Sequence, residues 1–331
     1  MNAAICEPLT LLNIHPVLLD VGAAGPQPKI WQPIAHRSFY VGFDPDHQEL
    51  QKISNRKFYQ ARLIHEAITE DQAASEVPFY LTRSSYCSSR LKPDSQSLAS
   101  FLFSDLFEVK RETQVRATNL NAALDRLKLR TVDWIKLDTQ GTDLRLFKSL
   151  REEIQGHVLA LDVEPGLIDA YQGEDLFVDT HRELTRSGFW LSSIEVRGAT
   201  RMRRSTLEHL STENHFLTET TVSETTRQSP AWCEARYFRT IESLAQIGVS
   251  KRDYALLWVF ALLDHHFGVA LDLALEYERV FGSDPVSLIL KQEPLRQIQR
   301  RRSRRWLLRL KSVVPEQLKQ ILKGVANEIV D

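Results

Sequence analysis

Residues 132–150 read VDWIKLDTQGTDLRLFKSL, and this stretch decides the fold class. Val132 to Asp138 is a short, largely apolar run, typical of a strand that is buried on both faces of a parallel sheet. Thr139-Gln140-Gly141 follows as a turn, and a helix is predicted from about Thr142 to Leu150. A strand, a glycine turn and a helix in direct succession form the repeating unit of an α/β protein.

The same unit recurs on both sides of this stretch. Upstream, strands are predicted at 16–21 and 39–44, with a brief helical stretch at 29–36 between them and a helix that opens at Pro45. Downstream, a strand at 158–163 precedes a helix at 175–187 and a strand at 188–196. This alternation predicts a doubly wound, mostly parallel α/β sheet with helices on both faces.

The remaining segments are less regular. We expect a third strand at 61–68, a short strand at 77–81, a polar loop at 84–93 and a helix at 119–127. The stretch 211–230 is rich in Ser, Thr and Glu and predicts an irregular segment. A last, antiparallel strand is expected at 234–239, and the periodicity is helical from Ile241 onward. We therefore divide the chain into a main α/β domain, residues 1–240, and a helical C-terminal extension, residues 241–331.

Composition limits the class of protein. The chain has 331 residues, 43% of them hydrophobic and 26% charged, with a formal net charge of -1. Three distant cysteines, Cys6, Cys87 and Cys233, predict neither a disulfide framework nor a zinc site. No secretory signal is evident, and the longest apolar run, 255–263, is too short to span a bilayer. These features predict a cytoplasmic protein that does not bind nucleic acid through its overall charge.

Polar and glycine residues mark the predicted ends of four strands. Strand 16–21 ends in Asp20-x-Gly22-x-x-Gly25, and strand 39–44 ends in Asp44. The later two end in Asp138-x-Gln140-Gly141 and Asp162-x-Glu164. Ligands of open α/β sheets bind beyond the carboxyl ends of the strands, so we expect these residues around one crevice.

This residue set favours a nucleoside cofactor that carries a positive charge. Gly22 and Gly25 allow the backbone to approach a ligand closely, and Asp44 follows Gly22 by 22 positions, near the spacing at which an acid reaches a ribose hydroxyl. The third glycine of the dinucleotide fingerprint is missing and Asp20 precedes the turn, which disfavours an NAD-linked oxidoreductase. The residues expected around S-adenosylmethionine are Asp20, Gly22, Ala23, Gly25, Asp44, Ala67, Ile68 and Asp138.

Residues 132–150 also resemble the central motif of the FkbM family of methyltransferases, in which a strand ending in Lys-x-Asp is followed by a glycine and a helix. The resemblance extends over 17–239 and includes Glu164, Tyr171, Gly173-Glu174, Phe177 and Gly188-Phe189. It implies a class I methyltransferase fold, a Rossmann-like sheet of seven strands, with S-adenosylmethionine as cofactor. It further implies methylation of a hydroxyl on a glycan or another small metabolite. Two positions depart from the family: Gln140 replaces an acid, and Ala24 replaces Asn.

For catalysis we expect a general base that removes the proton of the acceptor hydroxyl. Asp138 and Glu164 are the candidates, with His181 as a weaker one. Asp138, Asp162 and Glu164 form an alternative set for a divalent cation, because strand alternation predicts Asp162 and Glu164 on one face; we do not favour that interpretation. Plain structural roles remain open: Asp44 and Asp138 as helix caps, Glu164 as a solvated strand end, and Cys87-Ser88-Ser89 as an ordinary loop.

The C-terminal extension contains a basic amphipathic segment at 296–311. It has eight Lys or Arg residues and no acid, interleaved with Trp306, Leu307, Leu308 and Leu310. The rest of the chain keeps 34 basic and 43 acidic residues, a net charge of -9. The segment fits either a peripheral contact with the inner membrane surface or a helix docked on the acidic domain. The long extension and Gln140 leave a second function open, a non-catalytic binding or scaffolding module.

Overall fold

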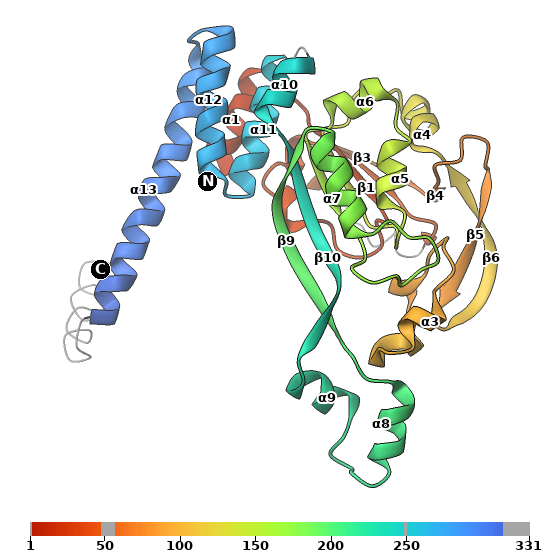
Figure 1. The fold of residues 1–331 in the computed structure, drawn as a ribbon. Coiled ribbons are helices and arrows are strands. Elements are labelled where there is room, and N and C mark those ends of the chain that lie inside the picture. The colour runs from red at the N-terminus through yellow and green to blue at the C-terminus, as the bar shows by residue number, and fades with distance from the viewer. Residues whose placement is uncertain (1, 48–56, 248–249, 314–331) are drawn as a thin grey trace.

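The computed structural model describes residues 2–47, 57–247 and 250–313 (Figure 1). Its centre is a seven-stranded sheet in the order β3-β2-β1-β7-β8-β10-β9. β10 runs antiparallel to both of its neighbours and the other pairs are parallel. The strands are β1 Val17–Val21, β2 Phe39–Phe43, β3 Gln60–Ile64, β7 Trp134–Leu137, β8 Ala160–Val163, β9 Phe189–Thr200 and β10 Gln228–Arg239. The predicted doubly wound, mostly parallel seven-stranded sheet is confirmed.

The register aligns the carboxyl ends of the central strands. Val21 at the end of β1 lies opposite Phe43 of β2 and Leu137 of β7, and Leu137 lies opposite Val163 of β8. The strand order reverses between β1 and β7, since β2 and β3 lie on one side and the later strands on the other. Loops that leave these four strands therefore meet at the point where such sheets bind ligands.

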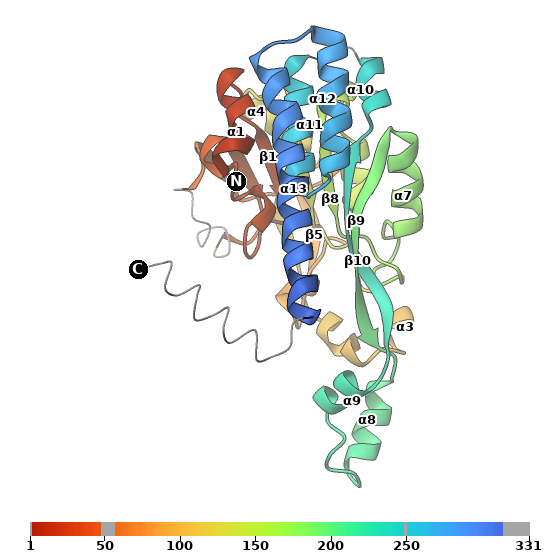
Figure 2. The same cartoon turned by 90° about the vertical axis from the view of Figure 1, so that its left-hand side faces the viewer.

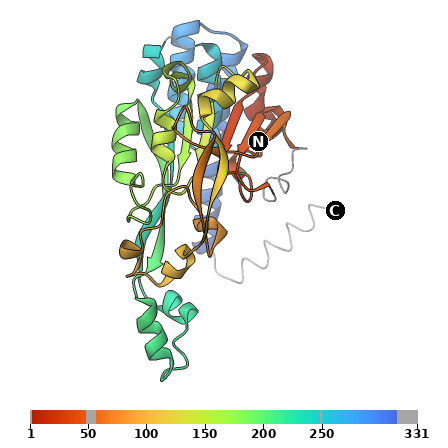
Figure 3. The same cartoon turned by 90° about the vertical axis from the view of Figure 1, so that its right-hand side faces the viewer.

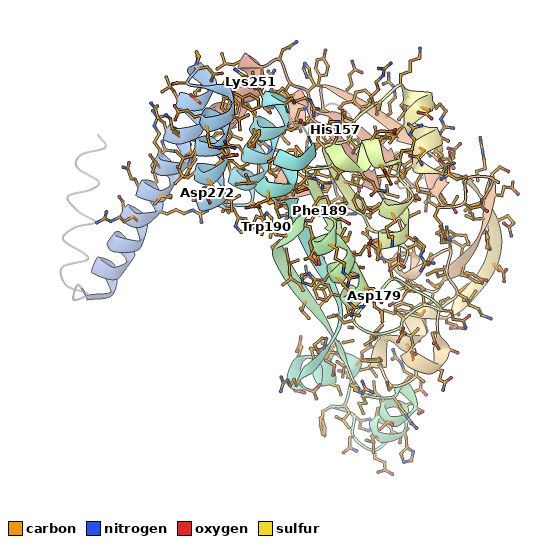
Figure 4. The ribbon with its side chains drawn as sticks, turned by 45° about the horizontal axis from the view of Figure 1, so that its top comes forward. His157, Asp179, Phe189, Trp190, Lys251 and Asp272 are labelled. Atoms are coloured by element: carbon orange, nitrogen blue, oxygen red, sulfur yellow. The ribbon has the colours of Figure 1, made fainter. Side chains whose placement is uncertain are left out.

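Helices cover both faces of the sheet, because successive strand residues face opposite sides. One face packs on α4 Leu120–Leu127, α5 Asp143–Lys148, α6 Glu152–His157 and α7 Phe177–Arg186. The other packs on α1 Asn2–Leu11, α10 Ile241–Ile247 and α11 Lys251–Leu263. Figure 4 shows the adjacent β9 residues that divide between these layers: Phe189 contacts Phe147 of α5, whereas Trp190 contacts His266 beside α11.

The C-terminal helices share a core with the sheet. Every side chain of α11 from Asp253 to Leu263 is buried, so the apolar run 255–263 is a core helix. The carboxylate of Asp133, fully buried before β7, accepts two bonds from Arg252 of α11, at 2.7 and 2.8 Å, and one from Val17 N at 2.7 Å. α12 Phe267–Phe281 and α13 Pro285–Val313 complete this layer (Figure 2). Within the described ranges, no helix combines the length and apolarity needed to cross a bilayer.

A second, three-stranded sheet lies beside the main one (Figure 3). The strand expected at 61–68 is divided: β3 ends at Ile64, and β4 Ala67–Ile68 joins a separate sheet in the order β4-β6-β5. Its partners are β5 Glu76–Thr82 and β6 Val109–Thr118. β6 was not predicted, because its sequence VKRETQVRAT is mostly exposed and lacks the apolar run of a buried strand.

The β9–β10 hairpin differs from the expectation that 211–230 is irregular. Both strands are longer than predicted, and two helices, α8 Arg204–Ser211 and α9 Glu219–Thr225, lie at the tip of the hairpin (Figure 1). The Thr218 hydroxyl accepts from Thr221 N at 3.1 Å and caps α9. The capping residue therefore marks the beginning of this short helix, although the pattern of apolar residues does not predict a helix here.

Short helical turns occupy the remaining connections. The helical stretch expected at 29–36 consists of two 3-10 turns, η1 Lys29–Trp31 and η2 Ala35–Arg37. The predicted polar loop 84–93 contains η4 Ser85–Cys87, and α3 Ser95–Leu98 and η5 Leu102–Phe107 follow it. Of the helix expected from Pro45, only residues 45–47 fall within the described residues, and of these His47 is helical.

Candidate functional site

A cavity of about 1110 Å³ opens at the carboxyl ends of the central strands. The loops after β1, β2, β7 and β8 form one side of it. β5, β6, η5 and the outer part of the β9–β10 hairpin form the opposite side. Of the residues predicted for the site, the cavity brings together Gly22, Asp44, Ala67, Ile68, Asp138 and Glu164. Its volume exceeds that of a pocket for one drug-sized molecule, so it has room for two ligands.

Gly22 allows the β1 loop to lie directly against the β7 loop. Its φ is +79°, and a Cβ at this position would lie 2.0 Å from the backbone oxygen of Asp138. Gly25 also has a positive φ, +95°, but a Cβ there would meet nothing within 4 Å. Neither Gly25 nor the buried Ala23 lines the cavity. The two glycines thus differ in role: both adopt a positive φ, but only at Gly22 does the absence of a side chain allow two strand ends to come into contact.

Asp44 lines the cavity at the end of β2 and is nearly buried. One carboxylate oxygen accepts from Ala24 N at 3.0 Å and the other from Asp46 N at 2.7 Å. Burial raises the pKa of Asp44 to about 6, although both backbone bonds oppose that shift. Because an ionised carboxylate has about four acceptor sites, Asp44 retains capacity for a ligand hydroxyl.

Asp20 lies beneath the cavity and does not line it. The side chain is 2% exposed and accepts from Tyr40 Oη at 2.9 Å. The Lys136 ammonium lies 3.5 Å from its other oxygen. Burial raises the pKa of Asp20, and Lys136 and Tyr40 oppose this shift. Asp20 therefore helps to position Lys136 from below the site.

Ala67 and Ile68 form an apolar wall of the cavity. Both side chains are buried, and the pairing of β4 with Ala117 and Thr118 of β6 holds them in place. Phe43 lines the same cavity. An apolar wall next to Asp44 fits a flat heterocycle joined to a hydroxylated sugar.

Asp138 is the charged centre of the site. Its Oδ2 lies 3.1 Å from the Lys136 ammonium, and its Oδ1 accepts from Gln140 Nε2 at 2.9 Å. Burial would raise the pKa of Asp138, but Lys136 and the hydrogen bonds outweigh it, so the pKa falls below its usual range. Asp138 is consequently ionised at neutral pH.

Glu164 is the second carboxyl group of the pair. It follows β8 directly and lines the cavity with Asp138. Burial and the negative charge of Asp138 raise the pKa of Glu164 to about 9. Two adjacent carboxyl groups that share one proton separate their pKa values in this way. In the free protein at neutral pH, Glu164 holds a proton beside an ionised Asp138.

Gln140 connects this pair to the far wall of the cavity. While its amide nitrogen donates to Asp138, its Oε1 accepts from Tyr171 Oη at 3.1 Å. Tyr171 Oη lies 3.0 Å from Cys87 O, and Ser89 Oγ donates to Gln140 O at 2.8 Å. An amide can donate and accept at once, which an ionised acid at position 140 could not do beside Asp138. The loop at 87–89 thus packs against the site.

Glu174 is a carboxyl group to which the sequence assigns no role. A Cβ on Gly166 would lie 2.0 Å from its Oε1, and one on Gly141 would lie 2.8 Å from its Cβ. Oε2 accepts from Tyr171 N at 3.0 Å, while Oε1 is buried and has no hydrogen-bond partner among the residues that the structure describes. Burial raises the pKa of Glu174 to about 7. The glycines after Asp138 and Glu164 therefore make room for a third carboxyl group.

Asp162 and His181 lie away from the cavity. Asp162 pairs with Arg236 at 2.6 Å and does not line the cavity, whereas Glu164 does, so the structure does not bring these two acids together at the site. His181 contacts Tyr237 Oη at 3.2 Å and does not line the cavity. Over the described ranges, no group of three His, Cys, Asp or Glu side chains is arranged to hold a metal ion.

The cavity carries an excess of negative charge and an aromatic region. Its lining contains seven acids, Asp44, Asp46, Glu66, Asp138, Glu164, Glu174 and Glu219, against two arginines, Arg90 and Arg111. Opposite the carboxyl pair, ring contacts at 5.3–6.5 Å connect Phe107, Phe103, Trp232 and Tyr171. This arrangement favours a cationic ligand near the strand ends and a neutral one against the aromatic rings.

Comparisons with known proteins place residues 26–191, half of the chain, in the Methyltransferase FkbM domain. Among solved structures, the chain is similar to a TehB-like SAM-dependent methyltransferase from Corynebacterium glutamicum, with 11% identity and a TM-score of 0.27. That match covers 72% of this chain and 88% of the other. Among curated proteins, no match was found.

Proposed function

Because the chain belongs to the FkbM family of methyltransferases, we propose that it transfers a methyl group from S-adenosylmethionine to a hydroxyl of a glycan or another small metabolite. The observation that carries the proposal is the convergence of Gly22, Asp44, Asp138 and Glu164 on one acidic cavity. Their separation in the sequence is large, and the parallel register of β1, β2, β7 and β8 alone brings them together.

The residues at the strand ends fit this cofactor. Ala67 and Ile68 would pack against the adenine ring, and Asp44 would accept from the ribose hydroxyls. The tight approach of Gly22 to Asp138 leaves backbone, without a side chain, beside the sugar. When bound, S-adenosylmethionine supplies a methyl group on a positively charged sulfur. The ionised acids of the lining, Asp138 above all, would stabilise that charge, whereas they would repel the phosphates of NAD.

The carboxyl pair supports removal of the acceptor proton. In the free protein the two carboxyl groups share one proton, which lies on Glu164. The negative charge of Asp138 is stabilised by the ammonium group of Lys136. A positive charge bound beside the pair lowers the pKa of Glu164, so that Glu164 loses this proton. The pair can then accept the proton of a hydroxyl that lies against it. Holding the hydroxyl about 3–3.5 Å from the methyl group supplies most of the remaining rate enhancement.

The acceptor would occupy the aromatic side of the cavity. Phe103, Phe107 and Trp232 present flat apolar surfaces, and Glu174 presents a buried oxygen without a protein partner. Aromatic faces contact the C–H faces of sugars, and a carboxyl group accepts hydrogen bonds from hydroxyls. These groups favour a neutral polyhydroxylated acceptor.

Calorimetry with S-adenosylmethionine and S-adenosylhomocysteine tests the cofactor assignment, with NAD as the comparison ligand. We expect binding of both adenosyl compounds and none of NAD. Absence of adenosyl binding would favour a non-catalytic module, and NAD binding would favour an oxidoreductase. With tritiated methyl donor and a panel of neutral oligosaccharides, Asp138→Asn and Glu164→Gln should lose methyl transfer at saturating methyl donor, with cofactor affinity measured separately by calorimetry. Wild-type turnover in both variants would end their catalytic assignment.

A further inference from the structure

α13 extends well past the helix on which it packs. α12 has 15 residues and α13 has 29, so α13 is longer by roughly 20 Å at 1.5 Å per residue. The two helices run side by side, and the guanidinium of Arg301 lies 4.8 Å from the ring centroid of Phe267, the first residue of α12. Beyond that contact, α13 projects away from the rest of the molecule (Figure 1).

The exposed side of α13 combines apolar and basic residues. Leu288, Leu295 and Arg302 recur at seven-residue intervals and thus lie along one side of the helix. Leu288 is 48% exposed and Leu295 49%, and Ile298 beside them is 41% exposed. Arg296, Arg300, Arg301 and Arg302 are exposed too. Within the segment 296–303, only Gln297 is buried, and the other side chains are exposed.

The side chains around this segment create a positive potential. A hollow beside the helix is lined by His265, Arg296, Arg300 and Arg301, with Gln297, Gln299 and Ser303 between them. Burial and the charge of Arg301 both lower the pKa of His265, so this histidine remains neutral more readily than usual. The sequence continues with four further Lys or Arg residues and no acid as far as residue 311.

We propose that the exposed surface of α13 binds an anionic membrane surface, through the apolar strip of Leu288, Leu295 and Ile298 and through the arginines 296, 300 and 302 around it. An apolar strip with basic residues around the rest of the helix is typical of interfacial helices. Each basic residue near an anionic surface strengthens binding by about five-fold. A second copy of the chain is the less favourable occupant, because two such helices repel each other.

Co-sedimentation of the full chain with vesicles tests this proposal. The probes are phosphatidylcholine vesicles with and without phosphatidylglycerol. We expect binding to the anionic vesicles only, and weakening as salt is added. The triple variant Arg296→Glu, Arg300→Glu and Arg302→Glu should bind at least about 100-fold more weakly.

A matched variant separates position from overall charge. The variant Arg130→Glu, Arg186→Glu and Arg227→Glu changes the net charge equally at exposed sites outside α13, and should bind as wild type. Both triple variants should keep the wild-type melting temperature. Absence of wild-type binding, or equal binding by the two variants, would overturn the proposal. A concentration-dependent dimer that is lost only in the α13 variant, without vesicle binding, would overturn it in favour of a second copy.

Discussion

Gly22→Ala tests the arrangement on which the site depends. The β carbon of alanine would lie 2.0 Å from the Asp138 carbonyl oxygen, and real Cβ contacts essentially never fall below 3.0 Å. The two loops must therefore separate by about 1 Å, a displacement that can reduce catalysis by about 100-fold. The positive φ adds a cost in stability of about 1–2 kcal/mol. We expect weaker binding of S-adenosylhomocysteine by calorimetry and about 100-fold slower methyl transfer.

Gly25→Ala is the matched control for this substitution. Its φ of +95° imposes a similar strain, but a Cβ there meets nothing within 4 Å. Urea denaturation should therefore show a loss of stability from strain in both variants and a larger loss in Gly22→Ala, while only Gly22→Ala loses cofactor affinity. Equal losses of affinity in both would refute the reasoning, because backbone strain and not the approach to Asp138 would then be the cause.

Three further perturbations follow from buried charges. The folded chain raises the pKa of Glu164 to about 9 and so holds this proton more tightly than the unfolded chain; the free energy of unfolding should fall between about pH 5 and 9, and Glu164→Gln should flatten that slope in urea titrations. An unchanged slope would contradict the shift. Lys136→Met removes the charge that lowers the pKa of Asp138, so the acidic limb of the activity profile should move to higher pH; an unmoved limb would exclude that role. Arg252→Met leaves the carboxylate of Asp133 buried with one backbone donor and should lower the free energy of unfolding by about 3–5 kcal/mol in chemical denaturation, where a loss below about 1 kcal/mol would contradict a buried ion pair.

Apolar runs were sufficient to locate the four central strands β1, β2, β7 and β8 of the main sheet. Each of those strands is buried on both faces, so its sequence is nearly continuous in apolar residues, and this pattern is local. Strand β6 and helix α9 escaped prediction because exposed residues carry little periodic signal. β3 and β4 were predicted as one strand for a different reason. The two segments are nearly adjacent in the sequence, but β3 pairs with β2 and β4 pairs with β6, and such pairing with distant strands is not encoded locally.

The sequence by itself determined the fold class and the positions of Gly22, Asp44, Asp138 and Glu164 at strand ends, because strands, turns and their order are properties of neighbouring residues. Only the tertiary structure decided which acids share a cavity. It buried Asp20 under Lys136 and paired Asp162 with Arg236. It also gave Gln140 two partners and seated Glu174 against two glycines. Such contacts join residues far apart in the chain, and the pKa of each carboxyl group depends on the charges that the fold places around it.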